Sequence, residues 1–164
     1  MTRHQKLLTL IPTAFFSICT TAQAFGSPET PSRIADMIKA DVAQIISGIN
    51  AHDVNQATRF DADDIVSMES GRPSSQGIAA EREGLSQAFL LEPSWRLRLI
   101  EENVDVARSG DMAIYRSTYY EDSVENDVPM THRVNFIAEF KRTSKGEFQV
   151  VWSIASSIEG SHKK

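Results

Sequence analysis

Three side chains in the second half of the sequence have the chemistry to move protons or to stabilise a negatively charged oxygen. His132 carries an imidazole, which can act as a general acid or base near neutral pH. Tyr115 and Tyr119 lie two pleats apart in a run rich in aromatic and β-branched residues, so both would point to one side of a strand. A tyrosine hydroxyl can donate a hydrogen bond to a developing oxyanion. We therefore interpret His132 and Tyr119 as candidate catalytic residues, and Tyr115 as a further residue of the same ligand pocket.

These candidates also have purely structural explanations. A single histidine on an apolar strand more often packs and forms hydrogen bonds than catalyses, and His132 shares its side of the strand with Phe136 and Phe140. The tyrosines would serve equally well in cross-strand packing. Trp152 follows the alternation of the last apolar run, which predicts a core position or a wall of the pocket.

Composition excludes several other kinds of chemistry. The chain has 164 residues and a net charge of -5, from 17 basic and 22 acidic residues, which predicts no nucleic-acid partner. A single cysteine, Cys19, excludes a disulfide framework and a cysteine-based zinc site. The acids from Asp61 to Glu69 lack the spacing of a calcium loop, and the sequence has no glycine-rich phosphate loop or nucleophile elbow. We therefore expect no metal and no cofactor.

The first 24 residues have the pattern of a cleaved secretory signal. Basic residues precede an apolar run from Leu7 to Cys19, and Ala22 and Ala24 supply the small residues of a cleavage site. We expect cleavage after Ala24 and a location in the periplasm or outside the cell. The alternative is an uncleaved anchor, which would need a longer apolar run. Since no later run approaches membrane-spanning length, we expect no membrane contact after signal cleavage.

After a linker over residues 25–30, the pattern predicts a single domain over residues 31–160. Thr30 and Pro31 are typical of a helix start, and apolar residues then recur at helical spacing to about residue 50. A second short helix, a turn over 61–64, a strand over 65–69 and a third helix over 75–91 follow.

From Trp95 onward the pattern changes to alternating apolar residues between turn signals, which is typical of strands. The expected strands cover 95–106, 112–121, 130–142 and 148–158, with an acidic loop over 122–129 and a loose tail over 161–164. Helices followed by adjacent antiparallel strands predict the α+β class. We expect N-terminal helices packed on a curved, mostly antiparallel sheet that forms a cone-shaped pocket.

The order of these elements resembles the nuclear-transport-factor-2-like superfamily, and within it the SnoaL-like and ketosteroid-isomerase-like domains. The resemblance covers roughly residues 34–157. It rests on Asn50–Asp53, Phe60–Val66, Gly77, Ser109–Ala113 leading to Tyr119, and Gly146–Val150.

The resemblance implies a small-molecule pocket and dimers formed through the sheet. Ser153 falls near a position of the last strand where many relatives carry an acid or another polar group, so we include it among the pocket residues. Steroid isomerases of this group use an aspartate base with a tyrosine and a protonated acid, and the first helix of this chain contains no tyrosine. That catalytic set is therefore not carried over.

Two functions from different classes remain open. In the first, an exported domain binds a small, largely apolar molecule. If this domain is an enzyme, His132 and Tyr119 carry out isomerase, dehydratase or cyclase-like acid/base chemistry on that molecule. In the second, the domain is a non-enzymatic interaction or dimerisation module with a filled pocket. Its contact surface would be the sheet face that carries Arg96, Arg98, Asn135 and Glu139.

Overall fold

The computed structural model describes residues 29–125 and 127–163. The predicted signal segment and cleavage site therefore lie outside the described residues. The elements follow in the order α1 (Pro31–Ala51), α2 (Val54–Ala57), β1 (Asp61–Glu69), β2 (Ser75–Gln76), α3 (Ile78–Leu91), β3 (Arg96–Val106), β4 (Met112–Glu125), β5 (Val128–Arg142) and β6 (Phe148–Lys163). None of the helices in the described part is long and apolar enough to cross a membrane.

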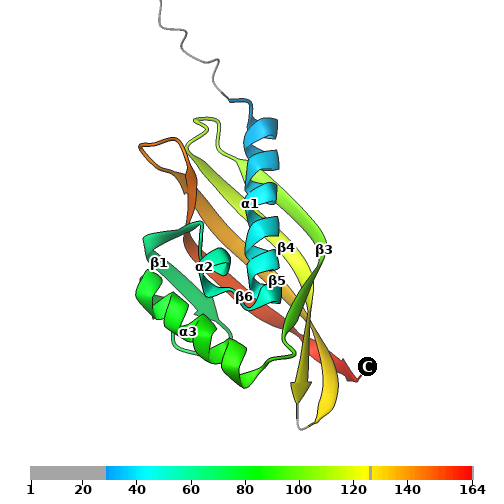
Figure 1. Cartoon of the computed structure of the whole chain (residues 1–164). Coiled ribbons are helices and arrows are strands. Elements are labelled where there is room, and N and C mark those ends of the chain that lie inside the picture. Colours follow the sequence, from blue (N-terminus) through cyan, green and yellow to red (C-terminus); the bar gives the residue numbers. More distant parts are fainter. Residues whose placement is uncertain (1–28, 126, 164) are drawn as a thin grey trace, which may run out of the picture.

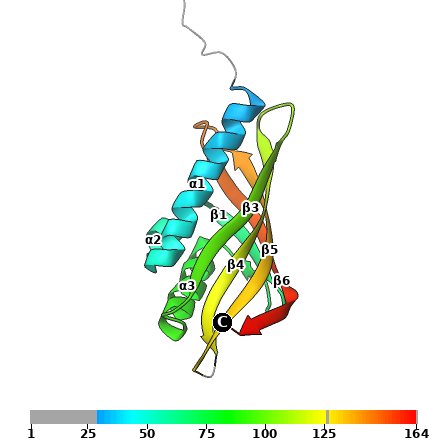
Figure 2. The same ribbon diagram turned by 90° about the vertical axis from the view of Figure 1, so that its right-hand side faces the viewer.

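The strands form one sheet in the order β2-β1-β6-β5-β4-β3. All neighbouring pairs are antiparallel except β1 and β6, which run parallel. The three helices lie on one face of this sheet (Figures 1 and 2). The predicted α+β class, with helices packed on a mostly antiparallel sheet, is confirmed. We call the helix-covered face of the sheet the inner face and the opposite one the outer face.

Helix α1 forms because its sequence caps both ends and carries one apolar stripe. The Thr30 hydroxyl accepts a hydrogen bond from the Arg33 amide, and Pro31 occupies the first turn, where its missing N–H is not needed. His52 ends the helix in a left-handed conformation with φ of 55°. The buried stripe of α1, Ile34, Ile38 and Val42, packs on the inner face against Ala113, Tyr115, Ala138 and Phe140.

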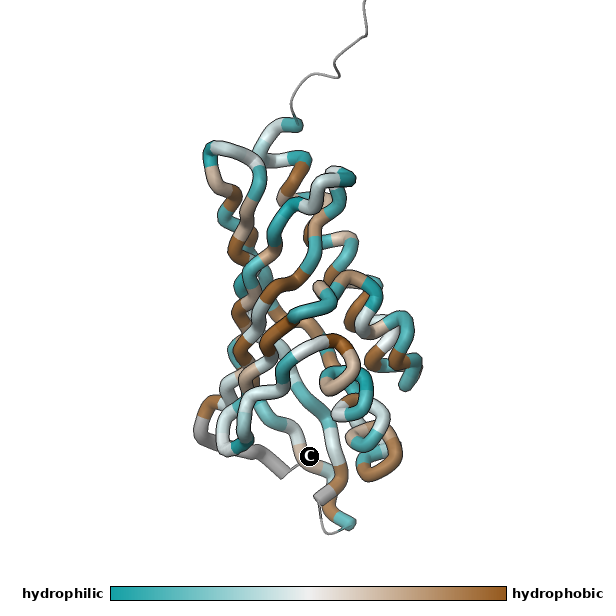
Figure 3. The backbone as a smooth tube through the Cα atoms, turned by 90° about the vertical axis from the view of Figure 1, so that its left-hand side faces the viewer, coloured by the Kyte–Doolittle hydropathy of each residue, from teal (hydrophilic) through white to brown (hydrophobic). Residues whose placement is uncertain are grey.

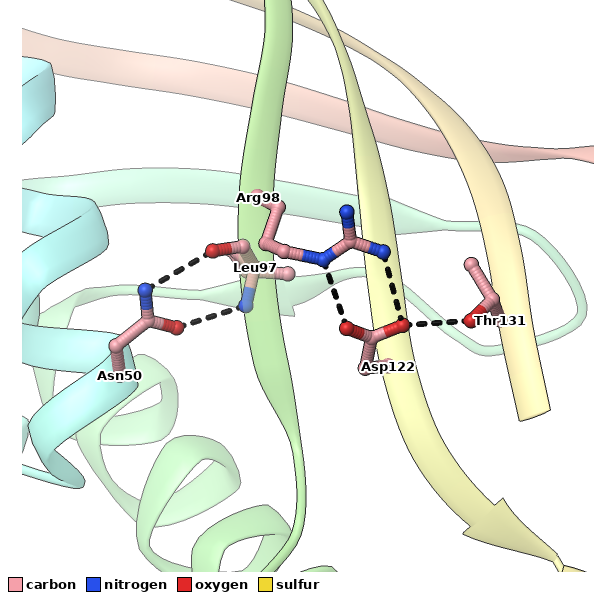
Figure 4. A network of polar contacts seen from close by, with 5 residues as sticks. All are labelled: Asn50, Leu97, Arg98, Asp122 and Thr131. Atoms are coloured by element: carbon pink, nitrogen blue, oxygen red, sulfur yellow. Dashed lines mark hydrogen bonds and ion pairs between the residues drawn. The ribbon is translucent and has the colours of Figure 1, made fainter. Parts of the chain in front are cut away.

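The end of α1 is joined to the edge strand β3 by the Asn50 side chain. Its amide nitrogen donates to the Leu97 carbonyl at 2.9 Å, and its oxygen accepts from the Leu97 amide at 2.7 Å (Figure 4). The side chain thus takes the place of a further strand at this point of the edge. This contact fixes the start of β3 beneath the helix end.

Strand pairing defines which residues share the inner face. On β4 these are the odd-numbered residues from Ala113 to Glu121, and on β5 the even-numbered residues from His132 to Phe140. Hydrophobic and hydrophilic residues alternate along the strands, as expected when helices cover one face only (Figure 3). The pairing contains several irregularities. One in β3 between Leu99 and Glu101, and one in β6 opposite the step from Glu139 to Phe140, each shift this alternation by one residue.

The structure corrects several predicted boundaries. Strand β1 already begins at Asp61, and Ser75 and Gln76 form β2 before α3 begins at Ile78. The predicted acidic loop is part of the long β4–β5 hairpin, in which Asp127 adopts a positive φ of 63°. Strand β6 continues to Lys163, where a loose tail was expected.

One acid of this hairpin, Asp122, has its charge paired across strands. The Asp122 carboxylate accepts from Arg98 Nε at 2.8 Å and from the Thr131 hydroxyl at 2.6 Å (Figure 4). These partners come from β3 and β5, on either side of β4. From the sequence alone, a run of acidic residues predicts a loop, although in the structure this run lies mostly within strands.

Candidate functional site

Polar side chains gather on the inner face toward the β4–β5 hairpin. Glu121 of β4 lies directly opposite His132 of β5, and Tyr119 lies opposite Val134, the next inner-face position. Glu69 ends β1 on the same face, because the neighbouring Ser67 and Glu69 pair with Ser153 and Ala155 of β6. The structure thus brings the two predicted catalytic residues, His132 and Tyr119, into one site.

The site is organised around the Glu121 carboxyl group. Burial raises the pKa of Glu121, and the nearby Glu69 carboxylate raises it further. His132, the Trp95 indole and Arg72 act in the opposite direction and lower it. The net effect is a pKa above the ordinary value for a glutamate, and such a shift is common among groups that act in proton transfer.

Tyr119 stays protonated beside these acids. Burial raises its pKa, and the charges of Glu121 and Glu69 raise it further. Its ring lies 6.3 Å, centroid to centroid, from that of Phe136. The phenol of Tyr119 is therefore available in the site as a hydrogen-bond donor and not as a base.

Tyr115 has a different environment. Its side chain is fully buried, and its hydroxyl donates to Glu102 Oε2 at 3.0 Å. The ring meets Phe136 and Phe140 edge-on, at centroid distances of 6.2 and 6.4 Å. The packing explanation thus describes Tyr115, whose hydroxyl already has an acceptor within the core.

The side chains of Trp152 and Ser153 lie on opposite faces of the sheet. Val150 pairs with Phe140 and Trp152 with Glu139, so Val151 is an extra residue in β6 and the alternation changes there. Trp152 consequently points to the outer face, where its indole N–H donates to Glu139. Its predicted place beside Val150 is corrected by this irregularity. Ser153 lies on the inner face opposite Ala138, and its hydroxyl donates to Ser67 Oγ at 3.4 Å.

Glu121 and Trp95 were not singled out from the sequence as site residues, and Glu69 was considered there only as a calcium ligand. Glu121 has the same alternation as Tyr115 and Tyr119, and that signal could have identified it. Glu69 stands at a strand end, and Trp95 precedes β3, so neither position carries a local signal. Among the described residues, no group of three or more histidine, cysteine, aspartate or glutamate side chains could hold a metal ion.

The outer face carries a separate feature. A cavity of about 510 Å³ lies over its middle, where it is lined by side chains including Arg116, Thr118, Asn135, Ile137 and Ile154. Tyr120, Ile154 and Ile158 of this face are each more than one-third exposed. No helix in the described part of the chain covers them (Figure 2). An uncovered apolar surface therefore lies on the outer face, away from the inner-face residue His132.

No family model matches the chain, and no curated protein sequence matches it. Several solved structures are similar. A proposed aromatic ring hydroxylase from Novosphingobium aromaticivorans is 19% identical with a TM-score of 0.71, over 83% of this chain and 96% of that one. A ketosteroid isomerase-like protein from Erwinia carotovora atroseptica is 19% identical with a TM-score of 0.65, over 77% of this chain and 97% of that one.

A third similar structure is a proposed dehydratase of the NTF2-like family from Streptomyces avermitilis. It is 15% identical with a TM-score of 0.68, and the match covers 80% of this chain and all of that one. At these identities the similarity establishes the fold alone. The reaction or ligand has to be inferred from the residues of the site.

Proposed function

Because the chain has the nuclear-transport-factor-2-like fold, we propose that it binds a small, largely apolar molecule against the inner face and transfers a proton to or from it. His132 and Glu121 are the proton-transfer groups, and Tyr119 donates a hydrogen bond to the oxygen that gains negative charge. Isomerisation, dehydration and cyclisation of a carbonyl compound all use this combination. The names of the similar structures, which include isomerase-like and dehydratase proteins, agree with this class of reaction.

The observation that carries this proposal is the direct pairing of Glu121 with His132 beside a protonated Tyr119. A carboxyl group and an imidazole on opposite strands are neighbours, with Cβ atoms about 5 Å apart. A carboxyl group and an imidazole can each act as a general acid or base, so the pair offers one group to accept a proton and one to donate it. Burial strengthens their interactions because water screens them less.

The acid/base part of the proposal can be tested with the bicyclic ketone 2-tetralone in D₂O. We expect the protein to accelerate exchange of the α-protons, followed by ¹H NMR. His132→Ala should lower the rate by about 100-fold, the usual contribution of a general acid or base. Tyr119→Phe should also lower it, because it removes the donor to the enolate oxygen.

Tyr120→Phe is the matched control for Tyr119→Phe, since Tyr120 is the next residue and lies exposed on the outer face. We expect no change in the exchange rate for this variant. Equal rates in wild type and His132→Ala would contradict the catalytic role of His132. A Tyr120→Phe variant as slow as Tyr119→Phe would show that the loss is not specific to the inner face.

We also propose that two copies of the chain associate through the outer face after export and cleavage following Ala24. The uncovered apolar side chains and the cavity around Ile137 and Ile154 favour this contact. Dimers through the sheet are what the family resemblance implies. A dimer is expected under either of the two functions, so this association is compatible with ligand binding at the inner face.

Native mass spectra of protein expressed with its own leader test the association and the cleavage together. We expect a chain that begins at Phe25 and a mass of two copies. Ile154→Lys should give one copy, because the charge would be buried in the contact. Leu90→Lys is the control, as Leu90 is 76% exposed on α3 and lies on the helix side of the sheet. A dimer that persists in Ile154→Lys, or is lost in Leu90→Lys, would contradict the outer-face contact.

A further inference from the structure

Behind the pair formed by Glu121 and His132, the outer face carries a second polar contact between the same two strands. Asp122 follows Glu121 on β4, Thr131 precedes His132 on β5, and the two pairs are neighbours in the register of the sheet. Since successive side chains of a strand point to opposite faces, Asp122 and Thr131 lie directly behind the inner-face pair. Any change in how β4 and β5 meet at the outer-face pair therefore moves the inner-face pair as well.

The Asp122 carboxylate holds this contact together through three hydrogen bonds. Arg98 of β3 donates from Nε to Oδ2 at 2.8 Å and from Nη2 to Oδ1 at 3.3 Å, and the Thr131 hydroxyl donates to Oδ1 at 2.6 Å (Figure 4). The Arg98 guanidinium also lies over the Tyr120 ring, 5.0 Å from its centroid. Bidentate pairs of this kind have a narrowly defined geometry. We call Arg98, Asp122 and Thr131 the Asp122 clamp, which joins β3, β4 and β5.

On the β3 side, the position of Glu121 is fixed by helix α1. Glu121 pairs with Leu97 of β3 in the register of the sheet. The Asn50 side chain of α1 bonds to both the amide and the carbonyl of Leu97. The helix thus holds β3, and through it β4, at the level of Glu121.

On the β6 side, His132 has no comparable support. Between residues 131 and 133 the β5–β6 pairing is irregular, because two steps along β5 correspond to four along β6, from Ile158 to His162. A regular ladder therefore does not continue past His132 on this side. The separation of His132 from Glu121 consequently depends on the contact between β4 and β5, which the Asp122 clamp fixes.

We propose that the Asp122 clamp is a positioning device, which holds Glu121 and His132 at the separation that proton transfer requires. This inference rests on the proposed function and adds to it residues that touch no substrate. Proton transfer depends strongly on such placement, because a shift of about 1 Å in a reacting group can lower a rate by about 100-fold. Loss of the Thr131 hydroxyl would let β5 move relative to β4 and take His132 away from Glu121.

Thr131→Val tests the clamp, because valine has nearly the shape of threonine, carries no charge and lacks the hydroxyl. With 2-tetralone in D₂O we expect kcat for exchange to fall about tenfold, with KM within about twofold of the wild-type value. Thr131→Ser should restore kcat, since serine keeps the hydroxyl. Circular dichroism checks that both variants fold. A loss of rate that Thr131→Ser does not restore would contradict the role of the hydroxyl.

Asp122→Asn has a matched control in Asp105→Asn. Arg116 and Asp105 form the same type of pair between β4 and β3, with Nη2 and Oδ2 2.6 Å apart, toward the opposite end of the two strands. We expect Asp122→Asn to lower kcat at least as much as Thr131→Val does, and Asp105→Asn to leave it unchanged. Equal losses for the two asparagine variants would mean that the rate follows the general stability of the sheet, and would overturn the proposal.

A further measurement needs no substrate. His132 lowers the pKa of Glu121, so His132→Ala should raise the midpoint of the Glu121 titration, followed by ¹³C NMR of its carboxyl group. In the Thr131→Val background the same substitution should give about half that rise or less, because the two groups start farther apart. Equal rises in the two backgrounds would overturn the positioning role, whatever the rates.

The outcomes also distinguish this inference from the proposed function. If wild type and His132→Ala exchange 2-tetralone at equal rates while the rise is smaller in the Thr131→Val background, the proposed function is contradicted and the clamp still positions the pair. If His132→Ala slows exchange and Thr131→Val does not, the proposed function stands and the positioning role is wrong. Slow exchange in both variants, restored by Thr131→Ser, supports both.

Discussion

A Gly48→Ala variant is expected to be less stable than the wild type by about 3 kcal/mol, as for an overpacked core position. Gly48 is buried on α1 where α2 crosses it. A Cβ atom at Gly48 would lie 2.4 Å from the Ala57 amide nitrogen and 2.7 Å from the Gln56 carbonyl carbon. Both are backbone atoms, and the Thr58 hydroxyl holds the end of α2 by donating to the Val54 carbonyl at 2.9 Å. The helices would have to move apart.

Gly84→Ala is the matched control, because Gly84 lies in the exposed middle of α3 with no atom within 4 Å of an added Cβ. Alanine is favoured over glycine inside a helix by about 1 kcal/mol, so this variant should be slightly more stable than the wild type. Urea unfolding at fixed pH measures both changes. Equal unfolding midpoints for Gly48→Ala and wild type would show that α2 can move away from α1 without loss.

The architecture could be predicted because local signals and tertiary contacts agree for most elements. Thr30 and Pro31 start α1 as expected, and the stripe from Ile34 to Val42 is buried against the sheet. Strands were recognised wherever apolar residues alternate between glycine-containing turns. The acidic end of the β4–β5 hairpin was missed, since its stability depends on Arg98 and Thr131, which only the folded sheet brings to Asp122.

The site was predicted in part because side-chain alternation holds as long as a strand is regular. It correctly placed His132 and Tyr119 on one face, and the same rule would have added Glu121. It failed for Trp152, because one extra residue in β6 reverses the alternation and nothing in the local sequence marks that residue. Whether these residues catalyse stays a prediction.

The Trp95 contact shows the limit of sequence reasoning more clearly. Its position depends on Phe89 and His52, which lie at the ends of two different helices. The acceptor group that it approaches, Glu121, lies on a third element. No spacing in the sequence predicts that Trp95 and Glu121 lie close together, because each residue is positioned by the packing of its own element. Sites assembled from element ends therefore have to be read from the folded chain.

Asp61 was interpreted as part of a turn, and its position in the structure predicts a strong dependence of stability on pH. The residue opens β1 and is largely buried. Burial is the main cause that raises its pKa, the nearby Glu81 of α3 adds to the rise, and Arg82 of the same helix opposes it. The net effect is a pKa of about 7. An aspartate in the unfolded chain has a pKa near 3.8.

The folded state therefore binds the Asp61 proton more tightly than the unfolded state does. The stability linked to this proton is fully present below pH 3.8 and is lost as the pH rises through about 7. Ionised Asp61 then lies buried beside Glu81, which disfavours the folded state. From the size of the shift, and allowing for partial exposure, this loss amounts to about 2–4 kcal/mol.

Asp61→Asn should remove this loss, because asparagine keeps the shape of the protonated acid and never ionises. At pH 4 the variant and the wild type should have nearly equal free energies of unfolding, and at pH 8 the variant should be more stable by about 2–4 kcal/mol. Asp64→Asn is the control, since Asp64 lies exposed on the same strand, and it should leave the pH dependence unchanged. Urea unfolding at several pH values between 4 and 8 gives the required curves. A difference between Asp61→Asn and wild type that is constant over this range would mean that Asp61 is ionised in the folded protein throughout, with solvent or Arg82 compensating its charge.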